Sequence, residues 1–363
     1  MNRNAMIAVV LIVIIGVAGV GVWLFIQPVT NPFNVAIVFA TGGLGDKSFN
    51  DGCYEGASDA ADDFGITFTY VETEDVADYE GFIRQYAQHT GYIEPYELIV
   101  CIGYDQLAPL TEVATEYPDQ QFAIIDESLD NESTTAVEFP NVLGLKFKEH
   151  EGSALVGAMA GLMTTTDKIG FVGGMDIPLI NKFAGGYAWG ANYTNPDCNV
   201  TLTYPWDFGD PTKGKTSADT LYGLGCDIVF AAAGATGLGV FDSVKELNGT
   251  EAYPLWAIGV DSPQMYLGTE DPSDPVGPSL IMTSMIKKVN VAVYEAIKDA
   301  CYDEDFAGGL KEFDIANGGI DYEVNSTLLQ IDQDILSVVD ELKESISNGT
   351  IDLDPFDHKW WLD

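Results

Sequence analysis

The sequence predicts an α/β fold made of two lobes, each with a parallel β-sheet covered by helices. From residue 33 onwards, short runs rich in Val, Ile, Phe and Tyr alternate with helical segments, which is the pattern of parallel strands joined by crossover helices. This pattern occurs twice in succession, and 363 residues suit two lobes of about 150 residues better than one core. We therefore expect an internal duplication with a cleft between the lobes.

Four strands are expected in each lobe, and the chain supplies them in order. They are residues 34–39, 67–71, 98–102, 122–125, 168–172, 200–204, 228–231 and 255–260. A helix is expected over 149–163, where the Gly and Ala content indicates close packing against a sheet. Because ligands of open α/β sheets bind beyond the carboxyl ends of the strands, the residues that follow each strand are the candidate site.

The beginning of the chain is strongly apolar. Ala5 to Ile26 is a run of 22 uncharged residues, which as a helix is about 33 Å long and matches a bilayer core. A cleaved signal peptide has a shorter apolar region, of about 7 to 15 residues. We expect an uncleaved single-pass anchor helix followed by a tether, over residues 1–31. Arg3 precedes the apolar run, so the positive-inside rule leaves the folded part outside the membrane.

The charge balance restricts the partners. The formal net charge is −40, and Arg3 and Arg84 are the two arginines. Nucleic acid and anionic lipid would be repelled. Few arginines also count against a ligand held through a carboxylate or phosphate. A neutral ligand fits better, and solubility in a salty medium outside the cell accounts for the charge.

Five cysteines are an odd number, so at least one is free. Cys198 and Cys226 each precede a predicted strand of the second lobe and are the best candidates for a disulfide, if any forms. Six Asn-x-Ser/Thr sequons occur where chance predicts about two, which favours glycosylation outside the cell, with enrichment of polar turns as the alternative. The sequons begin at Asn131, Asn192, Asn199, Asn248, Asn325 and Asn348.

Five ordered motifs resemble the basic membrane protein family of solute-binding proteins, which includes purine nucleoside receptor lipoproteins. The motifs are Gly42 to Asn50 with Tyr54-Glu55-Gly56; Phe122 to Asp126; Gly173 to Pro178 with Phe183 and Gly186; Val229 to Gly234; and Gly259 to Ser262 with Thr283 to Val289. The resemblance covers residues 34 to 322. The chain departs from the family at Leu44-Gly45 and in lacking the lipid-attachment cysteine, which the anchor helix would replace.

The resemblance implies a type I periplasmic-binding-protein fold, with two Rossmann-like lobes joined by a three-stranded hinge. We expect lobe 1 to comprise residues 32–147 plus about 280–308, and lobe 2 residues 148–279 plus about 309–358. The implied function is an extracytoplasmic solute-binding protein of an ABC importer, which is a monomer that binds a nucleoside, with a purine favoured, and presents it to a permease. The permease and ATPase are separate chains, and neither a cofactor nor a metal is expected.

By the same resemblance, Phe49 and Phe183 would stack on the two faces of a base, and Asp261 would bind two ribose hydroxyls. A carboxylate suits a vicinal diol because its two oxygens accept both protons. Asp126 ends a strand and would read a base edge. The alternatives are core packing for the two rings, a helix cap for Asp261, and a cap or hinge role for Asp126.

Further candidates lie beside these. Ser48 and Asp51 form a weak capping box, so exposed amides around Asp46 to Asn50 would hold a polar ligand edge. Of the adjacent Lys287 and Lys288, one can face the cleft if both lie on a helix, and the family pattern favours Lys287. The remaining candidates are Asp46, Lys47, Asn50 and Gly234 as ligand contacts, and Met285 as a lining residue or core residue.

Other classes of protein are less well supported. Gly209 to Thr216 matches the P-loop letters GxxxxGK[ST], which suggests a nucleotide hydrolase, but residues 205–208 separate it from its strand. His89, His150 and His358 are scattered without metal-ligand spacing, so we expect no enzyme. A ligand-sensing ectodomain of the same fold, or a binder of a simple sugar, remains the nearer alternative. The Trp360-Trp361 pair has no assigned role.

Overall fold

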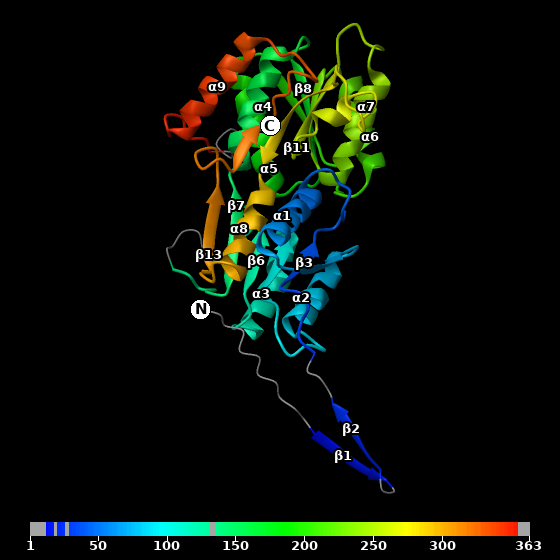
Figure 1. The fold of residues 1–363 in the computed structure, drawn as a ribbon. Helices are drawn as coiled ribbons and strands as arrows, with labels where there is room; N and C mark the ends of the chain where they lie inside the picture. The colour runs from blue at the N-terminus through cyan, green and yellow to red at the C-terminus, as the bar shows by residue number, and fades with distance from the viewer. Residues whose placement is uncertain (1–11, 18–19, 26–28, 131–135, 355–363) are drawn as a thin grey trace.

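The computed structural model describes residues 12–17, 20–25, 29–130 and 136–354. Two lobes lie one above the other, and each contains a six-stranded sheet (Figure 1). The strand orders are β13-β7-β6-β5-β3-β4 and β14-β12-β11-β10-β8-β9. The predicted α/β fold with two parallel-sheet lobes is confirmed. Asn131, His358 and the Trp360-Trp361 pair lie outside the described residues.

The strands of the first sheet all run parallel. They are β3 (Val35–Phe39), β4 (Phe68–Glu72), β5 (Leu98–Ile102), β6 (Phe122–Ile125), β7 (Val142–Phe147) and β13 (Gly309–Phe313). Helices α1 (Phe49–Phe64) and α8 (Val289–Cys301) cover one face, and α2 (Tyr79–Ala87) and α3 (Leu107–Glu116) cover the other. Short 3-10 turns precede α2 and α3 at Val76–Asp78 and Tyr104–Gln106. Because both faces are covered, β3 and β5 are continuous apolar runs.

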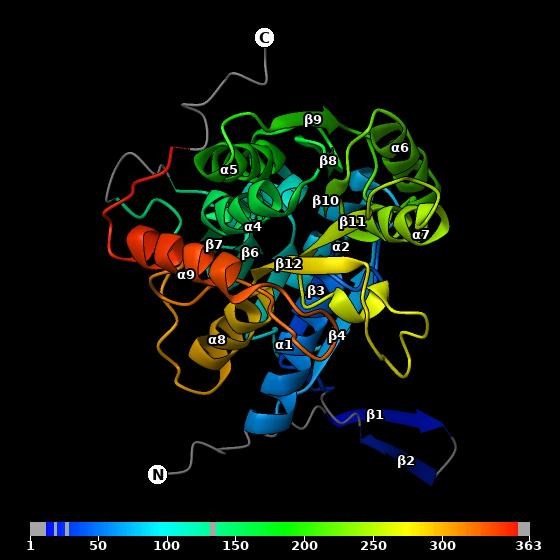
Figure 2. The same ribbon diagram turned by 90° about the horizontal axis from the view of Figure 1, so that it is seen from above.

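The second sheet is parallel except for its edge strand β14, which pairs antiparallel with β12. Its strands are β8 (Lys168–Gly173), β9 (Asn199–Thr203), β10 (Ile228–Ala232), β11 (Trp256–Asp261), β12 (Ile281–Lys287) and β14 (Ile320–Tyr322). Figure 2 shows α4 (Glu149–Met163), α5 (Pro178–Thr194) and α9 (Gln333–Ser347) on one face, and α6 (Pro211–Gly223) and α7 (Leu238–Leu247) on the other. Two 3-10 turns lie at Gly234–Gly237 and Met265–Gly268.

Close packing of α4 on α5 explains the small residues in α4. A Cβ on Gly157 would lie 2.2 Å from the carbonyl oxygen of Tyr187, and one on Gly190 would lie 2.0 Å from that of Ala154. Such contacts require glycine, so the two helix backbones touch. This packing places the start of α4 and the cleft-facing end of α5 side by side.

All eight predicted strands form, and none of their ends differs by more than one residue. The expected division of the carboxyl-terminal part is corrected at two strands. β12 belongs to the second sheet, although residues from about 280 were expected in the first lobe, and β13 belongs to the first sheet, although residues from about 309 were expected in the second. β13 contains the charged residues Lys311 and Glu312, so its sequence has no apolar pattern from which its sheet could be predicted. It pairs with β7 at the edge of the first sheet.

In the described part of the chain, the backbone passes between the lobes three times, directly after β7, β12 and β13. The crossings are held to neighbouring segments by backbone hydrogen bonds. The Lys148 N–H donates to the Phe313 carbonyl at 2.9 Å, and the Lys288 N–H donates to the Gly319 carbonyl at 2.9 Å. Three linked segments therefore join the lobes.

The predicted anchor helix is wrong for the described part of the apolar segment. Residues Ile12–Val17 (β1) and Val20–Phe25 (β2) form an antiparallel hairpin that lies apart from both sheets (Figure 1). The two strands are rich in Val and Ile, whose branched side chains favour the extended backbone. Within the described ranges, no helix is long and apolar enough to cross a membrane.

None of the five cysteines, all within the described residues, forms a disulfide, so Cys198 and Cys226, the best candidates for a bridge, are not joined. Cys198 precedes β9 and Cys226 precedes β10, and β8 lies between these strands. Two strand spacings are about 9.6 Å, whereas the Cα atoms of a disulfide lie within about 7 Å. The two thiols are buried, and burial raises the pKa of Cys198 to about 12 and that of Cys226 to about 11.

Candidate ligand-binding site

A cavity lies between the lobes at the carboxyl ends of both sheets. Its volume is about 660 Å³ when the open solvent at its mouth is included, and the space available to the centres of water-sized molecules inside it is about 80 Å³. Eight of the nine predicted site residues line it: Asp46, Phe49, Asn50, Asp126, Phe183, Gly234, Asp261 and Lys287. The ninth, Lys47, does not line it, and neither does Met285, which packs against Gly152 in the core.

Lys287 is the buried cation of the cavity wall. Its Nζ lies 2.5 Å from Asp126 Oδ1 of the first lobe and 3.7 Å from Glu149 Oε1 of the second. Burial alone would lower the pKa of this ammonium, but the surrounding carboxylates raise it overall. The two adjacent lysines do not lie on a helix, which corrects the helical geometry considered from the sequence. Lys287 is the last residue of β12, and Lys288 directly precedes α8.

Aromatic rings surround the same ammonium. Lys287 Nζ lies 5.0 Å from the ring centre of Phe49, 5.0 Å from that of Phe147 and 5.7 Å from that of Phe183. Contacts of this kind contribute roughly 0.5 to 2 kcal/mol. Phe49 begins α1 in the first lobe and Phe183 lies on α5 in the second, so each lobe presents a ring to the cavity.

Asp261 and Asp126 occupy equivalent positions in the two lobes. Asp261 ends β11 and Asp126 follows β6, and both have a left-handed backbone, with φ values of 65° and 76°. Aspartate tolerates this conformation better than most residues do. The Asp261 Oδ2 atom accepts a hydrogen bond from Ser48 Oγ at 2.7 Å. Burial raises the pKa of Asp261 to about 6.

The beginning of α1 is capped by Asp46 and not by the expected box. The carboxylate of Asp46 accepts from the backbone N–H groups of Ser48, Asn50 and Asp51 at 2.9, 2.8 and 3.1 Å. These amides are therefore occupied, which corrects the expectation that they are exposed to a ligand. The Asn50 Oδ1 atom accepts from the Ala40 N–H at 3.2 Å, which leaves the side-chain nitrogen able to donate. Burial raises the pKa of Asp46.

Lys47 is turned away from the cavity. Its side chain is 47% exposed, and Nζ lies 3.2 Å from Asp51 Oδ2. The carbonyl of Lys47 accepts from Gln264 Nε2 at 2.8 Å. Lys47 therefore contributes its backbone to a contact between the lobes and does not provide a cation to the site.

Several hydrogen bonds close the cleft directly. Ser48 Oγ donates to Asp261 Oδ2, and Ser262 Oγ donates to the Ser48 carbonyl at 3.3 Å. Together with the hydrogen bond from Gln264 Nε2 to the Lys47 carbonyl, these two hydrogen bonds join the segment before α1 to the segment after β11. The structure is thus a closed form, in which lobe 1 and lobe 2 touch across the site.

Sequence reasoning missed part of the cavity wall. Tyr104 and Asp105 line it, as do Thr41, Leu179, Ile180 and Phe208. The Asp105 carboxylate accepts from Tyr79 OH at 3.2 Å, and burial raises its pKa. Tyr104 and Asp105 directly follow β5, a predicted strand, so the rule that sites lie at strand ends could have found them. Phe208 had no such signal, because it lies five residues beyond its strand.

The segment with P-loop letters does not form a phosphate site. The Asp210 carboxylate caps α6 by accepting from the Thr212 and Lys213 N–H groups at 2.9 and 3.3 Å. Lys213 Nζ lies 2.7 Å from Asp207, and Lys215 Nζ lies 2.9 Å from Asp219. A carboxylate thus occupies the helix terminus where a phosphate would bind. The geometry gives the hydrolase hypothesis no support.

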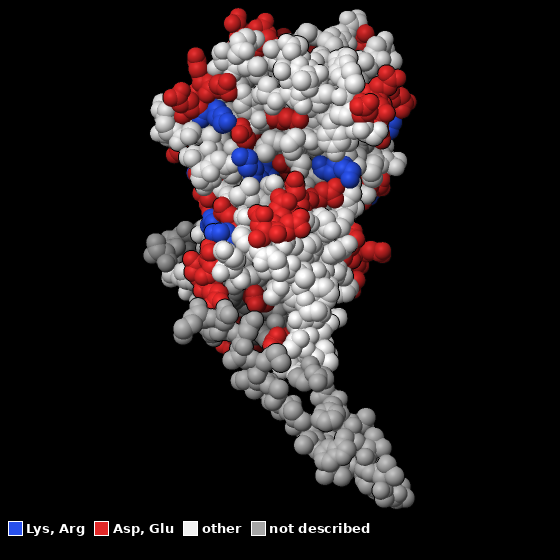
Figure 3. All heavy atoms as spheres, viewed as in Figure 1, with Lys and Arg blue, Asp and Glu red and all other residues white. Residues whose placement is uncertain are grey.

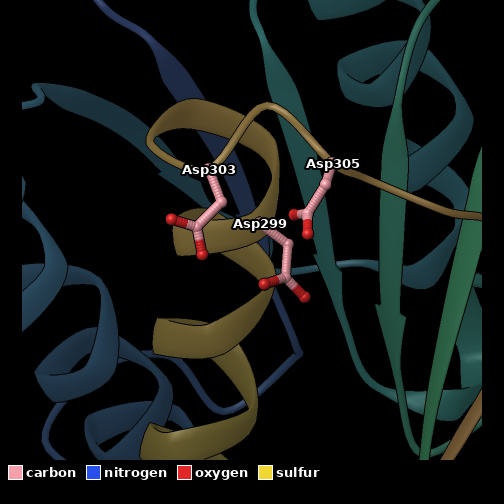
Figure 4. Close-up of side chains that lie close together, drawn as sticks. All are labelled: Asp299, Asp303 and Asp305. Carbon is pink, nitrogen blue, oxygen red and sulfur yellow. The ribbon is translucent and has the colours of Figure 1, made fainter.

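Charged groups outside the cavity suggest no second centre. Figure 3 shows acidic side chains over both lobes, with basic ones as separate patches. Among the described residues, Asp299, Asp303 and Asp305 lie close enough to hold a cation (Figure 4). Two of them are exposed, and Asp303 is paired with Lys298 at 2.7 Å, so we assign no metal site. Neither His89 nor His150 lines the cavity, and burial lowers the pKa of His150 to about 4.

Comparisons with known proteins find similar chains among ABC transporter substrate-binding proteins. The family model described as ABC transporter substrate-binding protein PnrA-like (Bmp) matches residues 33–353. The ABC transporter nucleoside-binding protein BmpA of Lactococcus lactis is 32% identical over 330 residues, which are 89% of this chain and 89% of that protein. An uncharacterized lipoprotein of Pyrococcus abyssi is 36% identical over 295 residues, 79% of this chain and 68% of the relative. An ABC transporter solute-binding protein of Aeropyrum pernix has a TM-score of 0.77 at 31% identity, covering 91% of this chain and 95% of that structure.

Proposed function

Because this chain belongs to the Bmp family of ABC transporter substrate-binding proteins, we propose that it binds a nucleoside, with a purine favoured, in the cavity between its lobes. One observation carries the proposal: Phe49 and Phe183, one from each lobe, line the same cavity as the Asp261 carboxylate. This combination suits a ligand with a flat aromatic part and a vicinal diol. The name of the BmpA relative from Lactococcus lactis agrees with it.

Each side chain of the cavity contacts a different part of the proposed ligand. The two phenylalanine rings stack on the base, which contributes roughly 1 to 3 kcal/mol per contact. Asp261 accepts hydrogen bonds from the ribose hydroxyls, and Asp126 and the Asn50 amide face the polar edge of the base. The Gly234 backbone adds a further contact. Lys287 offsets the repulsion between the cavity carboxylates and donates to the ligand.

The charge of the wall selects against phosphorylated ligands. Four carboxylates, those of Asp46, Asp105, Asp126 and Asp261, line the cavity with a single lysine. A phosphate in this place would meet mostly negative charge in a medium of low dielectric. A nucleoside is admitted, and a nucleotide is disfavoured.

Binding and presentation are the whole function, with no bond made or broken. The ligand bridges the lobes, and closure around the three crossings creates the surface that a permease recognises. The permease and its ATPase are separate chains, and the binding protein acts as a monomer. Membership of a substrate-binding family of ABC transporters supports these partners.

The folded part lies outside the cell, at the membrane. The lipoprotein relative from Pyrococcus abyssi supports an attachment at the membrane. Asn192, Asn199, Asn248 and Asn348 are exposed, as glycosylation requires. A native protein whose mass equals that of the unmodified chain would refute the glycosylation.

A thermal-shift panel on the full chain tests the ligand. Binding to the native state raises its stability by RT ln(1 + [L]/Kd), which is about 2.7 kcal/mol at 100 times Kd. We expect inosine, guanosine or adenosine to raise the melting midpoint, and free bases, pentoses and amino acids to leave it unchanged. If a pentose alone raises it, the protein is a sugar binder and the nucleoside proposal fails.

A further inference from the structure

Glu149 is a fully buried carboxylate just behind the cavity wall. It is the first residue of α4, directly after the first crossing between the lobes, and it is 0% exposed. Its Oε1 atom lies 3.7 Å from Lys287 Nζ, and its Oε2 atom lies 3.3 Å from Lys182 Nζ. The carboxylate therefore joins a lysine of the cavity wall to a lysine of α5.

We propose that Glu149 is a positioning residue, whose carboxylate holds the Lys287 ammonium on the second lobe, beside the ring of Phe183. Glu149 holds the ammonium in this place both when Asp126 of the first lobe contacts Lys287 and when it does not. This rests on the proposed function of the cavity, because it assigns Lys287 a ligand-facing role. The role of Glu149 acts through Lys287, since Glu149 itself does not line the cavity.

Two carboxylates lie within 4 Å of the Lys287 Nζ atom, and they belong to different lobes. Asp126 follows β6 of the first sheet, whereas Glu149 belongs to α4, which packs on α5 and β12 of the second lobe. Opening of the cleft separates residues of different lobes and leaves residues of one lobe together. Glu149 is thus the near partner that stays with Lys287, together with the more distant Asp261 of the same lobe, and Asp126 is the partner that closure adds.

The energetics of buried charge require such a partner. A buried ammonium that loses its counter-ion costs several kcal/mol. Lys287 is 2% exposed, so on opening it would bear this cost if Asp126 were its sole partner. Glu149 reduces the cost, and Lys182 in turn compensates the second oxygen of Glu149. The Glu149–Lys287 ion pair also keeps the Lys287 ammonium from following Asp126 when the lobes separate, so the ammonium stays beside the Phe183 ring of its own lobe.

The chemical reactivity of the Lys287 amine tests the effect of Glu149 on Lys287 and needs no ligand. Reductive methylation with formaldehyde modifies the neutral amine, and peptide mass spectrometry compares Lys287 with the exposed Lys47 in the same sample. Removal of the neighbouring negative charge lowers the pKa of Lys287, and each unit raises the neutral fraction about tenfold. We expect Glu149→Gln to increase methylation of Lys287 relative to Lys47 by about fivefold.

Glu151→Gln is the matched control. Glu151 is also a buried carboxylate of the first turn of α4 and lies 3.4 Å from a lysine, Lys148, but it faces the hinge segment at Ile315. This variant should leave the Lys287 to Lys47 ratio unchanged. An unchanged ratio in Glu149→Gln, or an equal increase in Glu151→Gln, overturns the proposal.

Ligand binding provides the second measurement. We expect Glu149→Gln to weaken inosine binding by about tenfold in calorimetry, and Glu149→Asp, which keeps the charge, to recover part of it. If the wild-type protein binds no nucleoside, the proposed function fails, whereas the methylation ratio still decides the role of Glu149. Should Glu149→Gln not fold, the double variant Glu149→Gln/Lys182→Gln, which removes both charges of that pair, takes its place in both measurements.

Discussion

The Lys287 ammonium lies 2.5 Å from a carboxylate oxygen of Asp126, and the two residues belong to different lobes. Replacing Lys287 with methionine leaves Asp126 and Glu149 buried without their shared cation. Breaking a buried pair in this way costs about 3 to 5 kcal/mol. We expect Lys287→Met to lower the free energy of unfolding by this amount in urea denaturation and to abolish nucleoside binding. Lys288→Met is the control and should change stability by less than about 0.5 kcal/mol. Wild-type stability in Lys287→Met would contradict the assignment.

Asp261 makes stability depend on pH. Its pKa rises from 3.8 to about 6 on folding because the carboxyl is buried. The folded protein favours the protonated carboxyl of Asp261. The contribution of Asp261 to the free energy of unfolding is therefore complete below pH 4 and is lost as the pH rises through about 6. Asp261→Asn stays neutral at every pH. The free energy of unfolding of the variant, minus that of the wild type, should therefore rise by about 3 kcal/mol between pH 4 and pH 8. Equal differences at both pH values would refute this.

Ser48 holds the closed form through its hydroxyl. The Ser48→Ala variant loses the bond to Asp261 across the cleft, a loss of about 1 to 1.5 kcal/mol. We expect nucleoside affinity to fall about tenfold, with a larger radius of gyration in solution scattering without ligand. Ser58→Ala on the same helix removes a hydroxyl that bonds only to Tyr54 within α1 and should leave both unchanged. Equal effects of the two variants would mean that the cleft contact does not hold the lobes.

Phe49 offers a test of stacking, because its ring is half-buried and faces the cavity. Phe49→Leu keeps apolar volume but removes the π face, which should weaken nucleoside binding by roughly 1 to 3 kcal/mol. The change would appear in calorimetry as a higher Kd with little loss of stability. Phe64→Leu, at the other end of α1, provides the comparison and should bind as the wild type does. An unaltered Kd in Phe49→Leu would place the base elsewhere in the cavity.

The central strands β3, β5, β6 and β10 could be predicted because their apolar runs are buried on both faces, and the partly exposed β4 and β9 could be predicted from their β-branched and aromatic residues. Asp126 and Asp261 followed from the same reasoning, since each ends such a strand, and their left-handed backbones are ones that aspartate accepts. Asp105 lies three residues after β5, so it fits the same rule of sites at strand ends. These parts of the site depend on local sequence.

Other parts depend on contacts that a linear pattern does not contain. Lys47 has the right position for the cavity, but Asp51, four residues later, draws its side chain to the surface. β13 is half polar, and its sheet is decided by pairing with β7, more than 160 residues earlier in the chain. At the beginning of the chain, an apolar run of Val and Ile suits a helix or a strand equally by hydropathy, and here the described residues form a hairpin.

The three crossings also govern the order in which a growing chain can fold on the ribosome. β3 to β7 are complete once residue 147 has been made, but β13, which covers the edge of β7, follows only after β8 to β12 of the other lobe. The apolar edge of β7 stays open during this interval, as an edge to which other chains can pair. Translation that stops early leaves both lobes unsealed, because β13, β14 and α9 all come from the last 55 residues.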